Sequence, residues 1–409
     1  MSCTPYELAA AYHDEEYFVF LDSSRTGGEQ GRYSVLAWKP RAVLRIKGEL
    51  PFQAIHEVFR AGPRVVIGYF SYDLFRFLEQ YKDLKAVDDL ALPDCCVMAY
   101  DKIHIFDHQA QQWKGEVPEL TPARIGSCSI GEAEAGMTRE QYVASVRKAL
   151  EYIAAGDIYQ VNLSQRFSHS FEGSPFALFS ALRQVSPSYY SAYLNCGDHV
   201  VLSSSPELFL RQRGLSIETR PIKGTRPRGR TEEGDRALRQ ELIDSAKEAA
   251  ELTMIVDLER NDLGRVCEYG SVEVAEHRYI DELPSVFHTV STVRGRLRPE
   301  ANPWDILRAT FPGGSISGCP KIRAIEIIDE LEPVRRHVYT GAIGLVSPED
   351  IELSIAIRTM TVAGGRLLYH VGSGIVADSD PDKEYEETLQ KAAGMRTAIE
   401  QCRQRIKST

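Results

Sequence analysis

The sequence of 409 residues predicts a fold of mixed α-helices and β-strands (α/β, in the α+β arrangement), and three observations support this class. Several segments alternate apolar and polar residues or stay apolar for five or six residues, which predicts strands. Other segments repeat apolar residues at helical spacing behind a capping residue, which predicts helices. The composition, 43% apolar and 26% charged, is typical of a soluble globular protein with a large core.

The net charge of −10 does not favour broad binding to nucleic acid. An anionic substrate would therefore need local positive groups or a metal ion. No apolar run approaches the length of a membrane span, and the first residues, M-S-C-T-P-Y-E-L, lack the order of a signal peptide. The eight cysteines lack zinc-ligand spacing, so we expect reduced thiols and a cytoplasmic protein, with Cys95 and Cys96 as small buried residues.

The first 110 residues predict a β-rich region, with candidate strands at 17–21, 31–36 and 65–69. A break in composition follows over 108–136, which is polar and contains Pro118 and Pro122. We interpret 111–136 as a linker to a catalytic region, 137–409. The N-terminal strands are nevertheless expected to complete the same sheets, so the linker need not separate two independent domains.

Three segments are predicted to be helical, and each contains a candidate capping residue. The first begins at a capping box, Thr138 to Gln141, and ends near Gly156. The second covers 231–264 and contains another candidate box, Ser245 to Glu248. The third begins at Asp380, which is followed by a proline that suits the first helical position.

The stretch from Ser203 to Arg230 organises the rest of the chain. Its pattern predicts two facing strands joined by a turn at Gly214. It contains an isolated acid, Glu207, and Lys223, which is followed by a glycine that lets a ligand approach the backbone. A partly desolvated lysine in such a position can act as a nucleophile. Alternatively, Lys223 extends its ammonium to solvent at a strand end.

The segment P-I-K-G-T-R-P-R-G, residues 221–229, resembles a motif of the chorismate-utilising enzymes. The resemblance links lysine at position 223 to the aminodeoxychorismate synthases, whereas anthranilate, isochorismate and salicylate synthases carry alanine there. The strand predicted at 156–167 resembles another family segment. Isochorismate and salicylate synthases have a water-activating lysine at the position of Gln160. A glutamine amide takes up no proton near neutral pH, which argues for an aminating enzyme.

Two pairs of glutamates each share one face of a predicted helix, Glu248 with Glu251 and Glu384 with Glu387. Such a pair is usually a solvated helix face. If the two pairs converge, however, the four carboxylates need a cation, and oxygen ligands of this kind favour Mg²⁺. The resemblance implies Glu251 and Glu387 as direct ligands of Mg²⁺, with Glu248 and Glu384 as outer partners.

Several segments toward the C-terminus suggest binding of an anion. The glycine- and serine-rich stretch 311–321 enters a predicted helix but lacks the spacing of an ATP-binding P-loop. Arg358, predicted to lie in an apolar strand paired with 339–344, needs an anionic partner, either a structural acid or a ligand carboxylate. The resemblance implies further substrate-binding residues: Thr225, His288, Ser317, Gly318, Tyr339, Gly372, Ser373 and Gly374.

The resemblance covers nearly the whole chain and implies two large, mainly antiparallel sheets packed as a twisted sandwich with helices outside. It also implies synthesis of 4-amino-4-deoxychorismate from chorismate and ammonia, for p-aminobenzoate and folate. In this reaction Glu207 is the general acid, Lys223 is the covalent nucleophile and Mg²⁺ is the cofactor. No glutaminase module is found, so a separate glutamine amidotransferase subunit is expected to form a heterodimer with the chain. Binding of tryptophan by the N-terminal region stays open, because Ser23, Ser24 and Tyr33 equally suit turn and core positions.

Two alternatives remain at this point. Anthranilate synthase component I would aminate C2 of chorismate, and only Lys223 argues against it. A chorismate-binding regulatory subunit without activity would require damage to the carboxylates or to the acid, and the sequence shows none.

Overall fold

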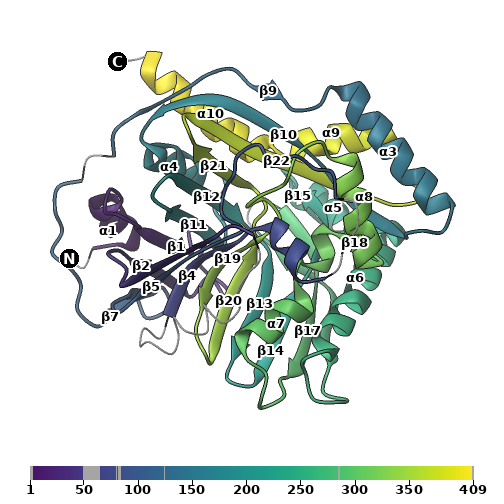
Figure 1. The fold of residues 1–409 in the computed structure, drawn as a ribbon, viewed down its shortest axis with the longest axis horizontal. Coiled ribbons are helices and arrows are strands. Elements are labelled where there is room, and N and C mark those ends of the chain that lie inside the picture. Colours follow the sequence, from purple (N-terminus) through teal and green to yellow (C-terminus); the bar gives the residue numbers. More distant parts are fainter. Residues whose placement is uncertain are drawn as a thin grey trace.

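The computed structural model describes residues 3–48, 65–79, 81, 84–123, 125–283 and 286–407. Two large antiparallel sheets form the centre of the molecule, and helices cover their outer faces (Figure 1). Buried side chains of both sheets meet in one apolar cluster, which includes Val19 and Leu194 from one sheet and Tyr69 and Met98 from the other. The predicted sandwich of two sheets is therefore confirmed.

The first sheet contains twelve strands among the described residues, with Gln160–Gly173 (β10) near one end. Its order is β18-β10-β22-β21-β12-β11-β1-β2-β6-β7, and β8 and β9 also pair with β10. The strands are β1 (Val19–Asp22), β2 (Tyr33–Ala37), β6 (His104–Asp107), β7 (Gln112–Lys114), β8 (Cys128–Ile130), β9 (Glu134–Ala135), β11 (Tyr190–Asn195), β12 (His199–Ser205), β18 (Gly318–Cys319), β21 (Thr359–Ala363) and β22 (Arg366–Ile375).

The second sheet contains ten strands within the described ranges, in the order β15-β17-β14-β13-β20-β19-β4-β5-β3, with β16 paired to β17. The strands are β3 (Ala42–Ile46), β4 (Val65–Phe70), β5 (Cys95–Tyr100), β13 (Leu208–Arg213), β14 (Ser216–Arg220), β15 (Ile222–Pro227), β16 (Glu273–Glu282), β17 (Val286–Arg296), β19 (Ala342–Val346) and β20 (Asp350–Ile355). Cys95 and Cys96 are buried in β5, as predicted.

Strands from the first 110 residues belong to both sheets. Strands β1, β2 and β6 extend the first sheet, and β3, β4 and β5 extend the second. Residues 111–136, which the sequence suggests as a linker, include β8 and β9, and both of these strands pair with β10. The division of the chain into two regions at this segment stays a prediction.

Helices pack against the outer face of each sheet. The first sheet is covered by α1 (Pro5–Tyr12), α3 (Arg139–Ala154), α4 (Pro175–Val185) and α10 (Ala393–Lys407), whose apolar side chains pack on its strands. The second sheet is covered by α6 (Ala246–Gly264) and α7 (Pro303–Thr310). The remaining helices are α5 (Glu232–Asp244), α8 (Lys321–Leu331), α9 (Pro381–Lys391) and the short 3₁₀ turns η1 (Tyr72–Phe77) and η2 (Gly314–Ile316).

The predicted helix starts are confirmed, with one refinement. Thr138 and Gln141 form the capping box of α3, and Asp380 accepts hydrogen bonds from the first turn of α9. The helical pattern of 231–264 is divided into α5 and α6 at Ser245, whose hydroxyl accepts a hydrogen bond from the backbone N–H of Glu248. Among the described helices, none is both long enough and apolar enough to cross a membrane.

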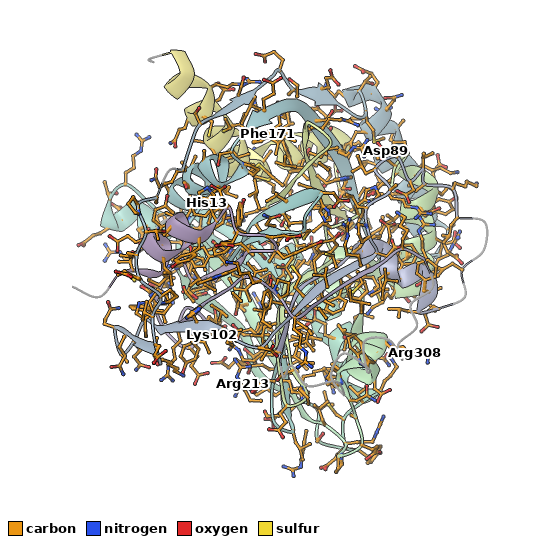
Figure 2. All side chains as sticks on the ribbon, turned by 60° about the vertical axis from the view of Figure 1, so that its left-hand side comes forward. His13, Asp89, Lys102, Phe171, Arg213 and Arg308 are labelled. Atoms are coloured by element: carbon orange, nitrogen blue, oxygen red, sulfur yellow. The ribbon has the colours of Figure 1, made fainter. Side chains whose placement is uncertain are left out.

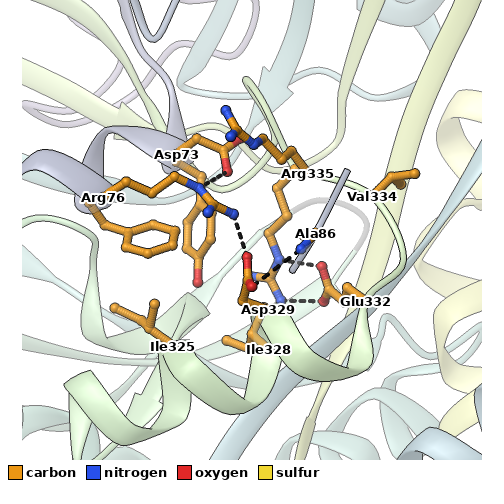
Figure 3. Close-up of a pocket in the computed structure, with 12 residues that line it drawn as sticks. Asp73, Arg76, Ala86, Ile325, Ile328, Asp329, Glu332, Val334 and Arg335 are labelled. Atoms are coloured by element: carbon orange, nitrogen blue, oxygen red, sulfur yellow. Dashed lines mark hydrogen bonds and ion pairs between the residues drawn. The ribbon is translucent and has the colours of Figure 1, made fainter. Parts of the chain in front are cut away.

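Side chains fill the space between the elements, and charged residues such as Lys102, Arg213 and Arg308 are exposed at the edge (Figure 2). Some charged residues are buried instead, around a pocket between η1 and α8 (Figure 3). Arg76 lies there between Asp73 and Asp329, and both of these ion pairs are almost fully buried.

Arg336, at the edge of this pocket, connects the segment that follows α8 with η2 and β10. It is 2% exposed and binds both oxygens of Glu332, with nitrogen–oxygen distances of 2.6 and 2.9 Å. It also donates to the backbone carbonyls of Ile316 and Asn162. Glu332 in turn accepts from the backbone N–H of Ser164 at 2.8 Å. This ion pair therefore holds β10 against the turn η2.

We expect Arg336→Met to lower the free energy of unfolding by about 3–5 kcal/mol, because Glu332 would remain buried without a cation. Unfolding by urea, followed by circular dichroism, measures this change. The control is Arg296→Met, because Arg296 forms an ion pair with Glu268 in which both side chains are largely exposed. Such a pair contributes at most about 1 kcal/mol. Equal effects of the two substitutions would contradict the role assigned to Arg336.

Candidate active site

Glu207 and Lys223 lie in one site, which two neighbouring strand ends create. The predicted hairpin around Gly214 is confirmed, with φ of +56° at that glycine. Leu208 pairs with Arg220 across the hairpin, so Glu207 lies beside the start of β15, where Lys223 is found. The Lys223 ammonium donates a hydrogen bond to the carbonyl of Ser315 at 3.1 Å. The hydroxyl of the same serine interacts with the Glu207 carboxyl.

Burial shifts both groups toward their neutral forms. It raises the pKa of Glu207, which is 5% exposed, although Ser315, Lys223 and the backbone N–H of Ile222 oppose the rise. Burial also lowers the pKa of Lys223 below its ordinary value, and the negative charges of Glu251 and Glu207 only partly oppose this. A carboxyl that keeps its proton can act as an acid, and an amine that loses its proton can act as a nucleophile.

The two helices that carry the glutamate pairs converge beside Lys223. Lys247 of α6 lies 3.9 Å from a carboxylate oxygen of Glu251 and 3.9 Å from one of Glu384 on α9. Burial raises the pKa of Glu251, and the charges of Glu387 and Glu384 add to the rise, whereas Lys223 and Lys247 oppose it. The carboxylates of both helices are therefore close enough to repel one another.

Basic side chains compensate the other two acids. Glu387 forms an ion pair with Lys391 at 2.7 Å, and Glu248 forms one with Arg226 at 2.8 Å. Burial raises the pKa of Glu387, but the positive charges of Lys391, Lys247 and Lys223 outweigh it and leave this pKa below its ordinary value.

The carboxylate oxygens of the four glutamates are chemically suited to bind a hard divalent cation. One carboxylate oxygen of Glu248 and one of Glu384 are buried without a hydrogen-bond partner. Carboxylate oxygens are the ligands that Mg²⁺ prefers. Within the described residues, no three acidic, histidine or cysteine side chains are grouped so that they could hold a metal ion. The Lys247 ammonium lies between a carboxylate of α6 and a carboxylate of α9.

Arg358 lies in a turn, and the prediction that it belongs to a strand is wrong. Strand β20 ends at Ile355 and β21 begins at Thr359, and Arg358 has φ of +50° between them. The turn was missed because its residues, Ala356 to Arg358, include neither glycine nor proline and continue the apolar pattern. Tyr339 likewise precedes β19, which begins only at Ala342.

The Arg358 guanidinium makes no ion pair or hydrogen bond with any residue in the described ranges. Burial lowers its pKa, and the charge of Glu207 opposes this shift. His288 lies near the same guanidinium, and burial together with the charge of Arg358 lowers the pKa of His288 to about 3. The neutral imidazole shares a hydrogen bond of 2.8 Å with the Thr225 hydroxyl. A partly buried cation beside a neutral histidine is suited to binding an anion.

Gly372 and Gly374 form the floor of the site, within strand β22. A Cβ atom at Gly374 would lie 2.9 Å from Nε2 of Gln160 and 3.8 Å from Nζ of Lys223. A Cβ atom at Gly372 would lie 3.0 Å from the hydroxyl oxygen of Tyr339. The hydroxyl of Ser373 instead faces the opposite side of the sheet, where it contacts the Tyr142 hydroxyl at 3.2 Å.

Ser317 and Gly318 shape the glycine- and serine-rich loop. The Ser317 hydroxyl donates to the carbonyl of Gly313 at 2.8 Å, so it is engaged within the loop. Gly318, with φ of +143°, permits close contact with β10, because a Cβ atom there would lie 2.2 Å from the carbonyl oxygen of Gln160. The hydroxyls of Ser23 and Ser24 are also used within the fold, by the Tyr33 carbonyl and by Ser191.

Sequence reasoning missed three residues of this site. Ser315 connects Glu207 with Lys223, and only its place in the glycine- and serine-rich loop indicated a role. Lys391 follows Glu387 by four residues, so the helical spacing used for the glutamates would also have identified it. Asn162 follows Gln160 by two residues, so it lies on the same face of β10.

The fold and the site define an enzyme of the chorismate-utilising class, and the chain belongs to the family described as chorismate binding enzymes, whose model matches residues 17–397. It is 38% identical to aminodeoxychorismate synthase component 1 of Bacillus subtilis, over 94% of the chain and 92% of that protein. It is 40% identical to anthranilate synthase component 1 of Thermus thermophilus, over 93% of the chain and 92% of that protein. The crystal structure of anthranilate synthase component I from Streptococcus pneumoniae is similar, with a TM-score of 0.79 and 31% identity, and the similarity covers 91% of this chain and 93% of that one.

We expect the Lys223 amine to react with an acetylating reagent at a lower pH than an exposed lysine, because burial lowers its pKa. Peptide mapping by mass spectrometry over a pH series measures the midpoint of the reaction at each lysine. Lys148 is the control, because it is exposed and its hydrogen bond to Glu151 raises its pKa.

The substitution Glu251→Gln sharpens this test. Glu251 is the acid whose charge most opposes the shift of the Lys223 pKa, so its removal should move the Lys223 midpoint to a still lower pH. A midpoint for Lys223 at or above that of Lys148 would contradict the electrostatic description of the site.

Proposed function

We propose that this chain is the chorismate-binding component of an aminodeoxychorismate synthase, which converts chorismate and ammonia to 4-amino-4-deoxychorismate. The observation that carries this proposal is the position of Lys223, whose amine lies beside the acid Glu207 on the floor formed by Gly374. A nucleophilic amine and a proton donor in one site match a reaction that replaces a ring hydroxyl through a covalent intermediate.

The proposed reaction begins with proton transfer from Glu207 to the C4 hydroxyl, which leaves as water. The neutral amine of Lys223 forms a bond to C2, and the two ring double bonds shift toward C4. Ammonia then bonds to C4, the double bonds shift back, and the C2–nitrogen bond breaks with its electron pair returning to Lys223. Glu207, now a carboxylate, accepts the proton that the incoming ammonia loses. The atoms balance, and both side chains return to their starting forms.

Two groups of residues hold the substrate in this proposal. Glu251 and Glu387 would bind Mg²⁺ directly, with Glu248 and Glu384 as outer partners, and the ion would neutralise the ring carboxylate when bound. The guanidinium of Arg358 and the hydroxyl of Tyr339 would bind the carboxylate of the enolpyruvyl side chain. Arg358 is suited to this role because the described residues leave its charge without an acidic partner. Such anchoring supplies the orientation that the ring chemistry requires.

We further propose that ammonia comes from a separate glutamine amidotransferase subunit. The names of the relatives support this, because each is called component 1 of a synthase. The product would then supply p-aminobenzoate and folate synthesis.

Anthranilate synthase component I is the second candidate. The support for it is similarity, because relatives of that name are 34 to 40% identical to this chain, and the aminodeoxychorismate synthase component 1 of B. subtilis, at 38%, lies within that range. The two activities differ in the carbon that receives nitrogen, so the product decides between them.

We expect purified protein to convert chorismate to 4-amino-4-deoxychorismate when Mg²⁺ and ammonium are supplied, and to stop when the metal is chelated. Liquid chromatography with mass spectrometry separates this product from anthranilate. Formation of anthranilate would overturn the assignment. Unchanged chorismate in the presence of folded protein would favour the third possibility, a regulatory subunit without activity.

We expect Lys223→Ala to lose most of the amination at C4 while it still binds chorismate, because the variant lacks the nucleophile but keeps the anion-binding residues. Initial rates and the dissociation constant for chorismate separate these effects. Lys148→Ala is a matched control on an exposed helix face and should retain both properties. A wild-type rate in Lys223→Ala would exclude the covalent step.

A further inference from the structure

The amide of Asn162 is buried in the candidate site and makes no hydrogen bond with the described residues. The residue is 8% exposed, and its Oδ1 atom is buried without a partner. Leaving a buried polar atom without a partner costs about 1–3 kcal/mol. Proteins rarely keep such an atom unless a ligand or an ordered water satisfies it.

The backbone of Asn162 is fixed on both sides, so its side chain has a defined position. Its N–H donates to the carbonyl of Ser317 at 2.9 Å, and its carbonyl accepts from the buried guanidinium of Arg336. The residue also lies within the ladder between β10 and β22, opposite Gly374. The free amide is therefore not the result of a mobile segment.

Asn162 and Tyr339 converge above one glycine. A Cβ atom at Gly372 would lie 2.9 Å from Oδ1 of Asn162 and 3.0 Å from the hydroxyl oxygen of Tyr339. Like the asparagine amide, the Tyr339 hydroxyl has no hydrogen-bond partner among the described residues, and its ring is held in place by stacking on His370 at 5.2 Å. Two unpartnered polar groups thus lie together beside Gly372, in the space that a side chain at this position would fill.

A second space of this kind lies two residues further along the same strand. There, Gly374 leaves room for the Gln160 amide and the Lys223 amine. Two residues of a strand span about 6.6 Å, which is comparable to the distance from a ring carbon of chorismate to its side-chain carboxylate. A ligand whose ring lies at Lys223 would therefore place its side chain near Asn162.

We propose that Asn162 is a substrate-positioning residue. Because no hydrogen bond with the described residues fixes the orientation of its amide, the amide can turn Nδ2 toward the position above Gly372 that Oδ1 now faces. There Nδ2 donates a hydrogen bond to the enolpyruvyl carboxylate of chorismate, together with the Tyr339 hydroxyl. This inference rests on the proposed function, which places the ring of chorismate beside Lys223. It adds a group that orients the end of the substrate opposite to the Mg²⁺ site.

The test compares Asn162→Ala with Asn162→Asp in direct binding of chorismate, measured by isothermal titration calorimetry. A hydrogen bond to a charged group is lost in the alanine variant, so its dissociation constant should rise about 10- to 100-fold. The aspartate variant should bind more weakly still, because its carboxylate repels that of the substrate. If Asn162 only filled space, the alanine variant would bind chorismate more weakly than the aspartate variant, because aspartate preserves the volume of asparagine.

The same titrations with trans-3,4-dihydroxycyclohexa-1,5-diene carboxylate, which lacks the enolpyruvyl group, locate the contact. Substitution of Asn162 should change its affinity little. Ser168→Ala is the control, because Ser168 lies on the same face of β10 six residues away and is similarly buried. The acetylation profile of Lys223 should be unchanged in all three variants, which shows that the site remains folded.

The outcomes separate this inference from the proposed function. Wild-type protein that fails to bind chorismate would overturn both. If the wild-type protein binds chorismate and both Asn162 variants bind it with the wild-type affinity, the inference alone is overturned. Equal losses for the two ligands would assign Asn162 to the ring rather than to the side chain, and would also overturn the inference as stated.

Discussion

The burial of an amine and a carboxyl against the same serine is the constraint on which the rest of the site depends. Lys223 donates to the Ser315 carbonyl, and Glu207 contacts the hydroxyl of that residue. Both groups lose solvation, so the pKa of the acid rises and that of the amine falls. Two exposed groups of these types would instead form an ordinary ion pair at neutral pH, and neither would be ready to transfer a proton or attack a carbon. The two sheets create this environment by bringing the end of one hairpin against the loop before α8.

Much of the fold follows from local patterns, and those patterns were read correctly. The cap at Thr138, the turn at Gly214 and the start of α9 at Asp380 each depend on a few neighbouring residues, whose side chains or backbone freedom determine the structure. The turn at Arg358 depends on tertiary contacts instead. Its preceding residues continue an apolar pattern, and the backbone N–H of Ala356 donates to the carbonyl of Gly341, which immediately precedes β19. A local reading cannot detect such a turn.

The site was predictable in its residue types and less so in its contacts. Spacing placed Glu248 with Glu251 on one helix face, but it could not show that Arg226 and Lys247 accompany them. Gln160 was identified by resemblance, whereas Asn162 becomes noticeable only when its amide is seen to lack a partner. The motif suggested Ser317 as a ligand-binding residue, and the structure adds that its hydroxyl donates to the Gly313 carbonyl. Whether a polar group is free or already bonded is a property of the packed structure, and the sequence alone does not contain it.

The charges around the site explain why substrate and cation would bind together in the proposed reaction. Glu251, Glu384 and Glu387 repel one another near Lys223, and the unpartnered Arg358 lies near Glu207 and His288. A dianionic substrate alone would pair with the positive charge of Arg358 but add negative charge beside the glutamates. A divalent cation alone would neutralise the negative charges of the glutamates but add positive charge beside Lys223 and Lys247. Bound as a neutral pair, the two compensate both groups of charges at once. Burial lowers the pKa of Lys223 and so favours the uncharged amine, which is the form that can attack the ring.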